Sequence, residues 1–368
     1  MRIQGTTILL GLILATAGCG QEFKLPPTPP QVPIPDAGRY LHEKTWELDA
    51  PTDVAVRGSY LYVITQNRGQ SPPTVKAQVE VFLTYLTNAT HPPAPIRQFT
   101  GVTDPTRICV VKSDSIFVLV TDRHQVMRTD TTTTVDHIDS TTVGGEVIYD
   151  TTFVTTEVVA RTSWYVKRFY YTGGAPLDSF PLPGDWDEVT GLTADEDLNV
   201  YVSDRIRDVV AKFSSKGRLL KMLTMRGTGG GYVNQARGLD WSGGELIVGD
   251  TGQDRVVFLN RDAENTQTRN PIPAPGDSTS AFSPRMPEDV SGERTGAFLF
   301  IADTGRNRIL KYRLTGEFVD SVYSAQASVP LEGGPIVSPR FVAVEERLVF
   351  VSDKDNNRLV TFALADSF

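Results

Sequence analysis

Cysteine is almost absent from this chain of 368 residues, which contains only Cys19 and Cys109. Two cysteines cannot build the multiple cross-links that hold small secreted domains together. Stability must therefore come from buried apolar surface. Cys109 stands in the apolar run Arg107-Ile108-Cys109-Val110-Val111, so we expect an inert buried thiol there rather than a reactive one.

Histidine is also scarce, and basic residues do not outnumber acidic ones. Four histidines occur, and 36 Lys and Arg stand against 44 Asp and Glu, for a formal net charge of −8. Nucleic-acid binding needs a basic surface that contacts phosphates, so this balance argues against nucleic acid as a partner. His42, His91, His124 and His137 are too few and too scattered in the sequence to favour a zinc site built from several histidines.

The N-terminus carries a short apolar run rather than a membrane-spanning one. Ile8–Ala15 is too short for a transmembrane helix and suits a signal segment. Thr16-Ala17-Gly18-Cys19, which follows, resembles the lipobox of bacterial lipoproteins. The resemblance implies removal of residues 1–18 as a signal peptide and lipidation of Cys19, with an ordinary secretory signal as the alternative. Lipidation would leave Cys109 without a disulfide partner.

Residues 19–39 form the lipidated cysteine and a tether. Six prolines between Gly20 and Gly38 favour an extended, polyproline-type spacer. No aspartate follows Cys19, so the resemblance to lipoproteins implies outer-membrane attachment in the cell envelope, with the lipid as the membrane contact. Residues 40–368 are enough for one large β domain.

One phrase recurs through the C-terminal half of the chain. Its copies are Val200–Phe213, Glu245–Phe258, Phe298–Tyr312 and Leu348–Phe362. The last three read similarly: an apolar run, an aspartate, a polar turn, an arginine and a second apolar run. An internal period of roughly 40 to 50 residues predicts a propeller or array whose units bury their faces against one another.

Each copy predicts two strands joined by a tight turn, within a four-stranded blade. The turn aspartate is expected to accept backbone hydrogen bonds in an Asx-turn, while Gly or Asn tolerates positive φ. The arginine is expected to reach a carboxylate or carbonyl of an adjacent repeat. Recurrence in several blades marks these residues as structural: Asp204, Asp250, Asp303, Asp353, Arg255, Arg308 and Arg358.

The residue before each turn gives the number of blades. These anchors are Thr65, Asp122, Asp204, Asp250, Asp303 and Asp353, which predicts an all-β, six-bladed propeller, with seven blades as the alternative. The long interval between the second and third anchors is interpreted as an insertion at about 123–163, between the second and third strands of blade 2. The chain ends before a fourth strand of blade 6, and Tyr40–Leu48 is expected to supply it and close the ring.

The repeats resemble NHL repeats. The match is best over Gly227–Tyr312, and the resemblance implies a propeller fold. The family includes protein binders, RNA binders, sensor ectodomains and a few lyases, so the resemblance implies no single function.

The loops that lead into the blades are expected to surround one mouth of the central channel. They place Arg107, Arg237 and Arg340 around the same opening as Asp53, Glu288 and Asp289. Mutual ion pairs that plug the channel are one interpretation. The other is a small anionic or zwitterionic ligand held by the arginines.

The insertion in blade 2 predicts a projecting β-hairpin with its reversal at Val143-Gly144-Gly145-Glu146. Loops displayed on a rigid scaffold often carry function, so the hairpin is a candidate partner-binding arm. Its candidate contact residues are Thr133, Val135, Ile138 and Phe153.

The sequence therefore favours a monomeric, non-enzymatic binding or scaffold module for an envelope protein, a peptide or a glycan, with no catalytic residues and no cofactor. The competing interpretation is a metal-dependent lyase or lactonase-type hydrolase using calcium or zinc at the channel mouth. Oxygen ligands for calcium would come from Asp53, Glu288, Asp289, Asn234 and Asp250. Against this, Glu288 and Asp289 are adjacent, and adjacent strand residues are expected to point to opposite faces.

Overall fold

The computed structural model describes residues 40–66, 76–84, 94–111, 117–133, 140–143, 146–149, 153–274, 281–324, 331 and 333–365. The predicted signal peptide, Cys19 and the tether lie outside these ranges. The described residues belong to one unit, Arg39–Phe368. Within them, no helix has the length and apolar character needed to span a bilayer.

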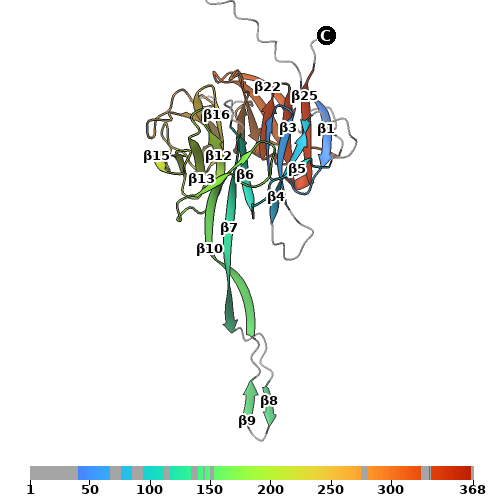
Figure 1. The fold of residues 1–368 in the computed structure, drawn as a ribbon, viewed down its shortest axis with the longest axis vertical. Coiled ribbons are helices and arrows are strands. Elements are labelled where there is room, and N and C mark those ends of the chain that lie inside the picture. The colour runs from blue at the N-terminus through green and yellow to red at the C-terminus, as the bar shows by residue number, and fades with distance from the viewer. Residues whose placement is uncertain are drawn as a thin grey trace, which may run out of the picture. The chain divides into compact units, whose positions relative to one another are not determined.

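The strands form six blades that follow one another along the chain (Figure 1). Blade 1 contains β2 (Asp53–Arg57), β3 (Tyr60–Gln66), β4 (Ala77–Leu83) and β5 (Arg97–Gln98). Blade 2 contains β6 (Pro105–Val110), β7 (Phe117–Thr133), β10 (Phe153–Tyr170) and β11 (Asp178–Pro181). Blade 3 contains β12 (Val189–Ala194), β13 (Val200–Asp204), β14 (Val209–Phe213) and β15 (Leu219–Thr224).

Blade 4 contains three regular strands, β16 (Ala236–Ser242), β17 (Glu245–Asp250) and β18 (Arg255–Leu259). Isolated bridges from β18 to Gln267 and Ile272 replace its fourth strand. Blade 5 contains β19 (Pro287–Gly292), β20 (Phe298–Asp303), β21 (Arg308–Arg313) and β22 (Phe318–Ser324). Blade 6 contains β23 (Phe341–Glu345), β24 (Leu348–Asp353), β25 (Arg358–Leu364) and the N-terminal β1 (Tyr40–Glu47).

The blades close into a ring. Each innermost strand (β2, β6, β12, β16, β19 and β23) contacts the innermost strand of the next blade, and β23 contacts β2. β1 pairs antiparallel with β25 at the outer edge of blade 6. The six-bladed propeller closed by an N-terminal strand is therefore confirmed, and the seven-bladed alternative is wrong.

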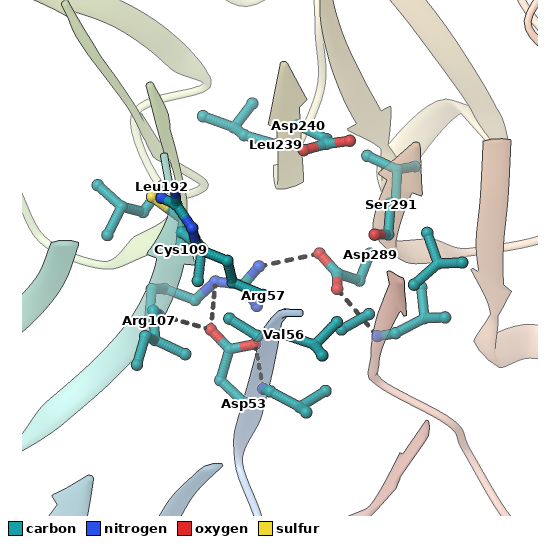
Figure 2. Close-up of a pocket in the computed structure, with 18 of the residues that line it drawn as sticks. Asp53, Val56, Arg57, Arg107, Cys109, Leu192, Leu239, Asp240, Asp289 and Ser291 are labelled. Atoms are coloured by element: carbon teal, nitrogen blue, oxygen red, sulfur yellow. Dashed lines mark hydrogen bonds and ion pairs between the residues drawn. The ribbon is translucent and has the colours of Figure 1, made fainter. Parts of the chain in front are cut away.

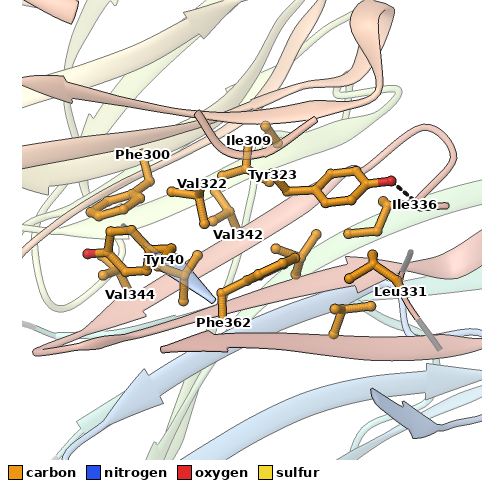
Figure 3. Close-up of a cluster of buried hydrophobic side chains, with 14 of the residues drawn as sticks. Tyr40, Phe300, Ile309, Val322, Tyr323, Leu331, Ile336, Val342, Val344 and Phe362 are labelled. Carbon is orange, nitrogen blue, oxygen red and sulfur yellow. Dashed lines mark hydrogen bonds between the residues drawn. The ribbon is translucent and has the colours of Figure 1, made fainter. Parts of the chain in front are cut away.

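Apolar side chains fill the six junctions between neighbouring blades instead of forming one central core. At the junction of blades 5 and 6, Tyr40 of β1 packs among Phe300, Val342 and Phe362 (Figure 3). Trp46, farther along β1, is buried at the junction of blades 6 and 1. The closing strand thus contributes to two junctions, because its two aromatic residues reach opposite sides of blade 6.

The strand register places two kinds of loop at the same end of the ring, which we call the mouth face. The anchor aspartate of the second strand, which ends that strand in blades 3, 4 and 5, pairs with the first residue of the innermost strand in four blades: Asp122 with Pro105, Asp204 with Val189, Asp250 with Ala236, and Asp303 with Pro287. The turns after the second strands and the segments leading into the blades therefore share one face, as the repeats predict.

The repeated aspartate and arginine form one unit in blades 4, 5 and 6. The arginine donates to the aspartate of its own turn: Arg255 to Asp250 and Arg358 to Asp353, both at 2.7 Å, and Arg308 to Asp303. The same guanidinium groups donate to carbonyls of the segment leading into the blade: Gly229 and Tyr232, Ala281 and Ser283, Gly334 and Pro335. The carboxylate partner thus lies in the same repeat, not in an adjacent one as predicted.

The turn aspartates differ between blades in what they bind. Asp204 accepts hydrogen bonds from the backbone N–H groups of Ile206 and Arg207, as in the predicted Asx-turn. Asp204 also accepts from the N–H groups of Asp187 and Glu188 in the segment leading into its blade, as Asp250 does from that of Asn234 at 2.7 Å. These carboxylates therefore fix the path of the chain between blades.

Positive φ falls on the residue just before the repeated arginine, not on the turn glycine. Asp254, Asn307 and Asn357 have φ of 53°, 51° and 52°. The glycine serves close approach instead, because a Cβ on Gly252 would lie 2.8 Å from the carbonyl oxygen of Asn234.

Blade 2 carries the predicted insertion. β7 and β10 pair from Phe117 with Tyr170 to Thr133 with Phe153, so both strands continue past the mouth face as an arm (Figure 1). Beyond them β8 (Ser140–Val143) pairs with β9 (Glu146–Tyr149), and Val143 faces Glu146 at the predicted reversal. Val135 and Ile138 lie outside the described residues, as do the side chains of Thr133 and Phe153.

Candidate functional site

The predicted channel residues occupy two sets of equivalent positions at the mouth. We call Asp53, Arg107, Gly191, Gly238, Asp289 and Phe341 the inner ring. The preceding residues, Thr52, Thr106, Thr190, Arg237, Glu288 and Arg340, form the outer ring. The contacts below show that the charged residues of the two rings form separate clusters.

Arg107 closes the inner ring by joining two carboxylates from different blades. Its Nη2 donates to Oδ1 of Asp289 at 2.9 Å, and its Nε lies 3.4 Å from Oδ2 of Asp53 (Figure 2). The guanidinium carbon also lies 4.4 Å from the ring centroid of Phe341. All three charged side chains are more than nine-tenths buried. The ion-paired plug considered from the sequence is therefore present at this level.

The inner-ring carboxylates also join neighbouring blades. The N–H of Ile108 in blade 2 donates to Asp53 of blade 1 at 2.8 Å, and that of Val342 in blade 6 donates to Asp289 of blade 5 at 3.0 Å. Gly238 completes this close packing, because a Cβ there would lie 2.5 Å from the Cα of Asp289. The inner ring therefore holds the propeller together.

Two buried carboxylates share one guanidinium, so the fully ionised cluster carries one net negative charge. Burial raises the pKa of Asp53 to about 7, while Arg107 opposes the shift and Asp289 adds to it. Burial also raises the pKa of Asp289, against the opposing effect of Arg107. The cluster therefore favours uptake of one proton, because charge in this low-dielectric interior is costly.

Glu288 stands between two arginines in the outer ring. Nη1 of Arg237 lies 3.3 Å from its Oε1, and Nε of Arg340 lies 3.8 Å from its Oε2. Neither contact is a hydrogen bond, and the Nε atoms of both arginines are shielded from solvent without a hydrogen-bond partner in the described part of the chain. Burial lowers the pKa of Arg237; Glu288 opposes this shift, and Arg205 and Arg340 add to it.

Adjacent residues contribute to both rings because the strand pairing is irregular there. The register of β19 against β20 shifts between Pro287 and Asp289, leaving Glu288 outside the regular alternation. Similar shifts occur in β6, β12 and β16. Such a bulge re-aims a side chain. Glu288 and Asp289 therefore both have ion-pair partners around the channel, but they belong to separate clusters.

Arg205, which sequence reasoning missed, belongs to the outer cluster. It follows the turn aspartate of blade 3, and its Nη2 lies 2.5 Å from Oε2 of Glu188. Arg107, predicted to act with Arg237 and Arg340, lies one ring deeper instead. The sequence contained a signal for Arg205: the residue after the turn aspartate is threonine in blades 4 and 5, so an arginine at this position in blade 3 departs from the repeat.

A cavity of about 70 Å³ follows the inner ring along the channel. Its lining runs from Asp53 and Asp289 at the mouth to Arg57 and Glu345 near the opposite end of the innermost strands. Figure 2 shows Asp53, Asp289 and Arg57 around this cavity. The volume suits a few water molecules. Cys109 is half-buried in its wall rather than enclosed in the core.

The sequence did not point to the polar lining of this cavity. Asp240 and Ser291 both face it, and Asp240 accepts a hydrogen bond from the N–H of Gly292 at 2.6 Å. Neither residue stands at a position that leads into a blade, and the predicted channel residues were all at such positions.

The oxygen ligands considered for calcium are dispersed. Asp53 and Asp289 bind Arg107, Glu288 faces two arginines, and Asn234 with Asp250 belongs to the turn of blade 4. Across the described ranges, no group of three or more His, Cys, Asp or Glu side chains is arranged to hold a metal ion.

Exposed apolar side chains also occur in the segments of the mouth face. Ile206, Met225, Met286 and Val337 lie in turns or lead-in segments of blades 3 to 6, and Val126 lies at the base of the arm. Their exposed fractions range from 42% to 59%. Solvent-exposed apolar residues gathered on one face are a feature of interaction surfaces.

Comparison with known proteins supports the fold alone. No family model and no curated protein matches the sequence, so the resemblance to NHL repeats stays a prediction. A protein of unknown function from Bacteroides thetaiotaomicron is similar in structure, with a TM-score of 0.55, 12% identity, and coverage of 89% of this chain and 72% of that one. Raptor from Chaetomium thermophilum gives 0.51 at 9% identity, covering 90% and 30%. Virginiamycin B lyase from Staphylococcus aureus gives 0.47 at 11% identity, covering 88% and 99%.

Proposed function

We propose that this protein is a non-enzymatic binding or scaffold module of the bacterial cell envelope. A lipid on Cys19 anchors it, and its partner is an envelope protein, a peptide or a glycan that docks on the mouth face. The observation that carries the proposal is the presence on that face of exposed apolar residues together with arginines whose Nε atoms have no hydrogen-bond partner among the described residues.

The composition of this face supports binding. Methionine and arginine are enriched at protein interfaces, where methionine adapts to irregular partners and arginine forms directional polar contacts. Met225 and Met286 are both exposed there, and the Nε atoms of Arg237 and Arg340 have no hydrogen-bond partner in the part of the chain that the structure describes. The channel below is closed by Arg107 with Asp53 and Asp289, so a partner would meet a surface rather than a deep opening.

Site-specific photo-crosslinking in intact cells tests the proposal. A photoreactive amino acid at Met286 or Val337 should give a discrete adduct. The same residue at Leu177 or Leu219, which are comparably exposed at 42% and 46% but lie on the outer parts of blades 2 and 3, should not. Adducts that are absent at all four positions, or equal at all four, would refute docking on the mouth face. Fractionation of Cys19→Ala, which should leave the membrane fraction, tests the anchor separately.

A further inference from the structure

Three arginines from blades 3, 4 and 6 meet at one side of the channel mouth. Arg205 comes from the turn of blade 3, Arg237 from the start of blade 4 and Arg340 from the segment leading into blade 6. Glu288 of blade 5 lies among them, and Glu188 pairs with Arg205. The other half of the outer ring consists of Thr52, Thr106 and Thr190, whose hydroxyls bond to groups of the protein.

The arginines hold more donors than their protein partners use. Each guanidinium has five N–H donors. Arg237 and Arg340 make ion pairs with Glu288 at 3.3 and 3.8 Å but no hydrogen bond within the described residues. The Nε atoms of all three arginines are shielded from water and unpartnered there. Because an unmet buried donor is costly, this cluster is better satisfied with an added acceptor.

The charge of the cluster indicates which acceptor fits. Three arginines against Glu188 and Glu288 leave one net positive charge, which a monovalent carboxylate neutralises. Arginine matches carboxylate geometry through two parallel N–H···O bonds. The side chains of Arg205, Arg237 and Arg340 are 26%, 22% and 39% exposed, so the cluster is open to a ligand from the mouth face.

Apolar neighbours indicate what carries the carboxylate. Ile206 directly follows Arg205, Met286 lies two residues before Glu288, and Val337 lies three before Arg340. All three are exposed. Aliphatic and thioether side chains exposed on the same face as a carboxylate site suit a peptide with apolar residues flanking an acidic group, more than they suit a sugar, which would favour exposed flat aromatic rings.

We propose that Arg205, Arg237 and Arg340 form a carboxylate-binding site that takes an acidic side chain or C-terminus of an extended peptide segment. This inference rests on the proposed function and assigns the chemistry of the partner. Glu288 occupies part of the site in the free protein and competes with the incoming carboxylate.

Fluorescence anisotropy with labelled peptide pools tests the site. The first pool carries a central aspartate and an amidated C-terminus. The second, neutral pool carries asparagine in place of the aspartate and an amidated C-terminus. The third carries the same asparagine and a free C-terminal carboxylate. We expect either carboxylate-bearing pool to bind at least about 10-fold more tightly than the neutral pool, or about 1.4 kcal/mol. The two pools separate a side-chain carboxylate from a C-terminal one.

Matched variants identify the residues responsible. Arg340→Gln and Arg237→Gln should each weaken carboxylate-dependent binding about 10-fold or more. Arg313→Gln, which removes an ion pair with Glu317 at the far end of blade 5, should not change it. Glu288→Gln should strengthen binding, because it removes the internal competitor; a purely structural ion pair predicts no gain.

The proposal is overturned if the three pools bind equally or none binds, if Arg340→Gln and Arg237→Gln bind like the parent protein, or if an acidic oligosaccharide binds where the peptides do not. Photo-crosslinking at Met286 separates this failure from failure of the proposed function. An adduct that persists without carboxylate-dependent peptide binding would leave a binding module with different partner chemistry.

Discussion

Replacing Trp46 by alanine should cost much of the stability of the ring, because this side chain links the closing strand to blade 1. Trp46 is 2% exposed in the junction of blades 6 and 1, and its ring centroid lies 5.6 Å from that of Phe82. Removing a buried tryptophan costs about 3–5 kcal/mol. Domains are typically stable by about 5–15 kcal/mol, so the expected loss is a large fraction of the total.

Chemical denaturation followed by far-ultraviolet circular dichroism measures the effect, since this signal does not depend on the lost indole. Leu41→Ala is the matched control, because Leu41 lies on the same strand but is 49% exposed; it should change stability by less than about 1 kcal/mol. At roughly 2–4 °C per kcal/mol, Trp46→Ala should also lower the melting temperature by on the order of 10 °C. Equal effects of the two substitutions would contradict the role given to β1 in ring closure.

Two further predictions concern the buried charges. Burial raises the pKa of Asp53 from 3.8 to about 7. Between these two pH values the folded protein retains a proton that the unfolded chain releases. The contribution of this carboxyl to the free energy of unfolding therefore falls as pH rises from about 4 to about 7, by about 4 kcal/mol at most. Asp53→Asn should flatten that part of the pH profile of thermal unfolding, and an unchanged slope would refute the assignment. Arg358→Gln should destabilise the protein by about 3–5 kcal/mol, because it leaves Asp353 buried without its partner at 2.7 Å. Adding Asp353→Asn should recover part of this loss in a double-mutant cycle; strictly additive losses would show that the pair is not coupled.

The fold could be predicted because the same sequence motif recurs in several blades along the chain. Aspartate and arginine flank the same turn at 250 and 255, 303 and 308, and 353 and 358, and each pair makes the same ion pair in the structure. The missing fourth strand of blade 6 followed from the same spacing, and β1 supplies it. Such local patterns can be recognised in the sequence because each copy packs against its neighbouring blades in the same way.

The arrangement at the channel mouth could be predicted only in part, because it depends on how six innermost strands meet. The lead-in positions were identified from the repeats, but the register shift between Pro287 and Asp289 could not be identified from them. Arg107 and Arg237 stand at lead-in positions of their blades yet join different clusters. Arg205 lies outside these positions and reaches the mouth from a turn. Contacts between residues far apart in the sequence determine which cluster each of these arginines joins, and the local sequence pattern does not show them.

The departures from the repeat indicate where a ligand would bind. Residues that recur in several blades, such as Asp250 and Asp303, join the turn to the lead-in segment and must be similar wherever that join is made. The outer ring carries no such requirement. The hydroxyls of its three threonines bond within the protein, whereas the Nε atoms of Arg237 and Arg340 have no hydrogen-bond partner among the described residues. A ring built from similar units thus acquires a polarised mouth, because one half can accept an anion and the other cannot. A partner bound there would be held in one orientation relative to the blades, with the arm of blade 2 on the threonine side.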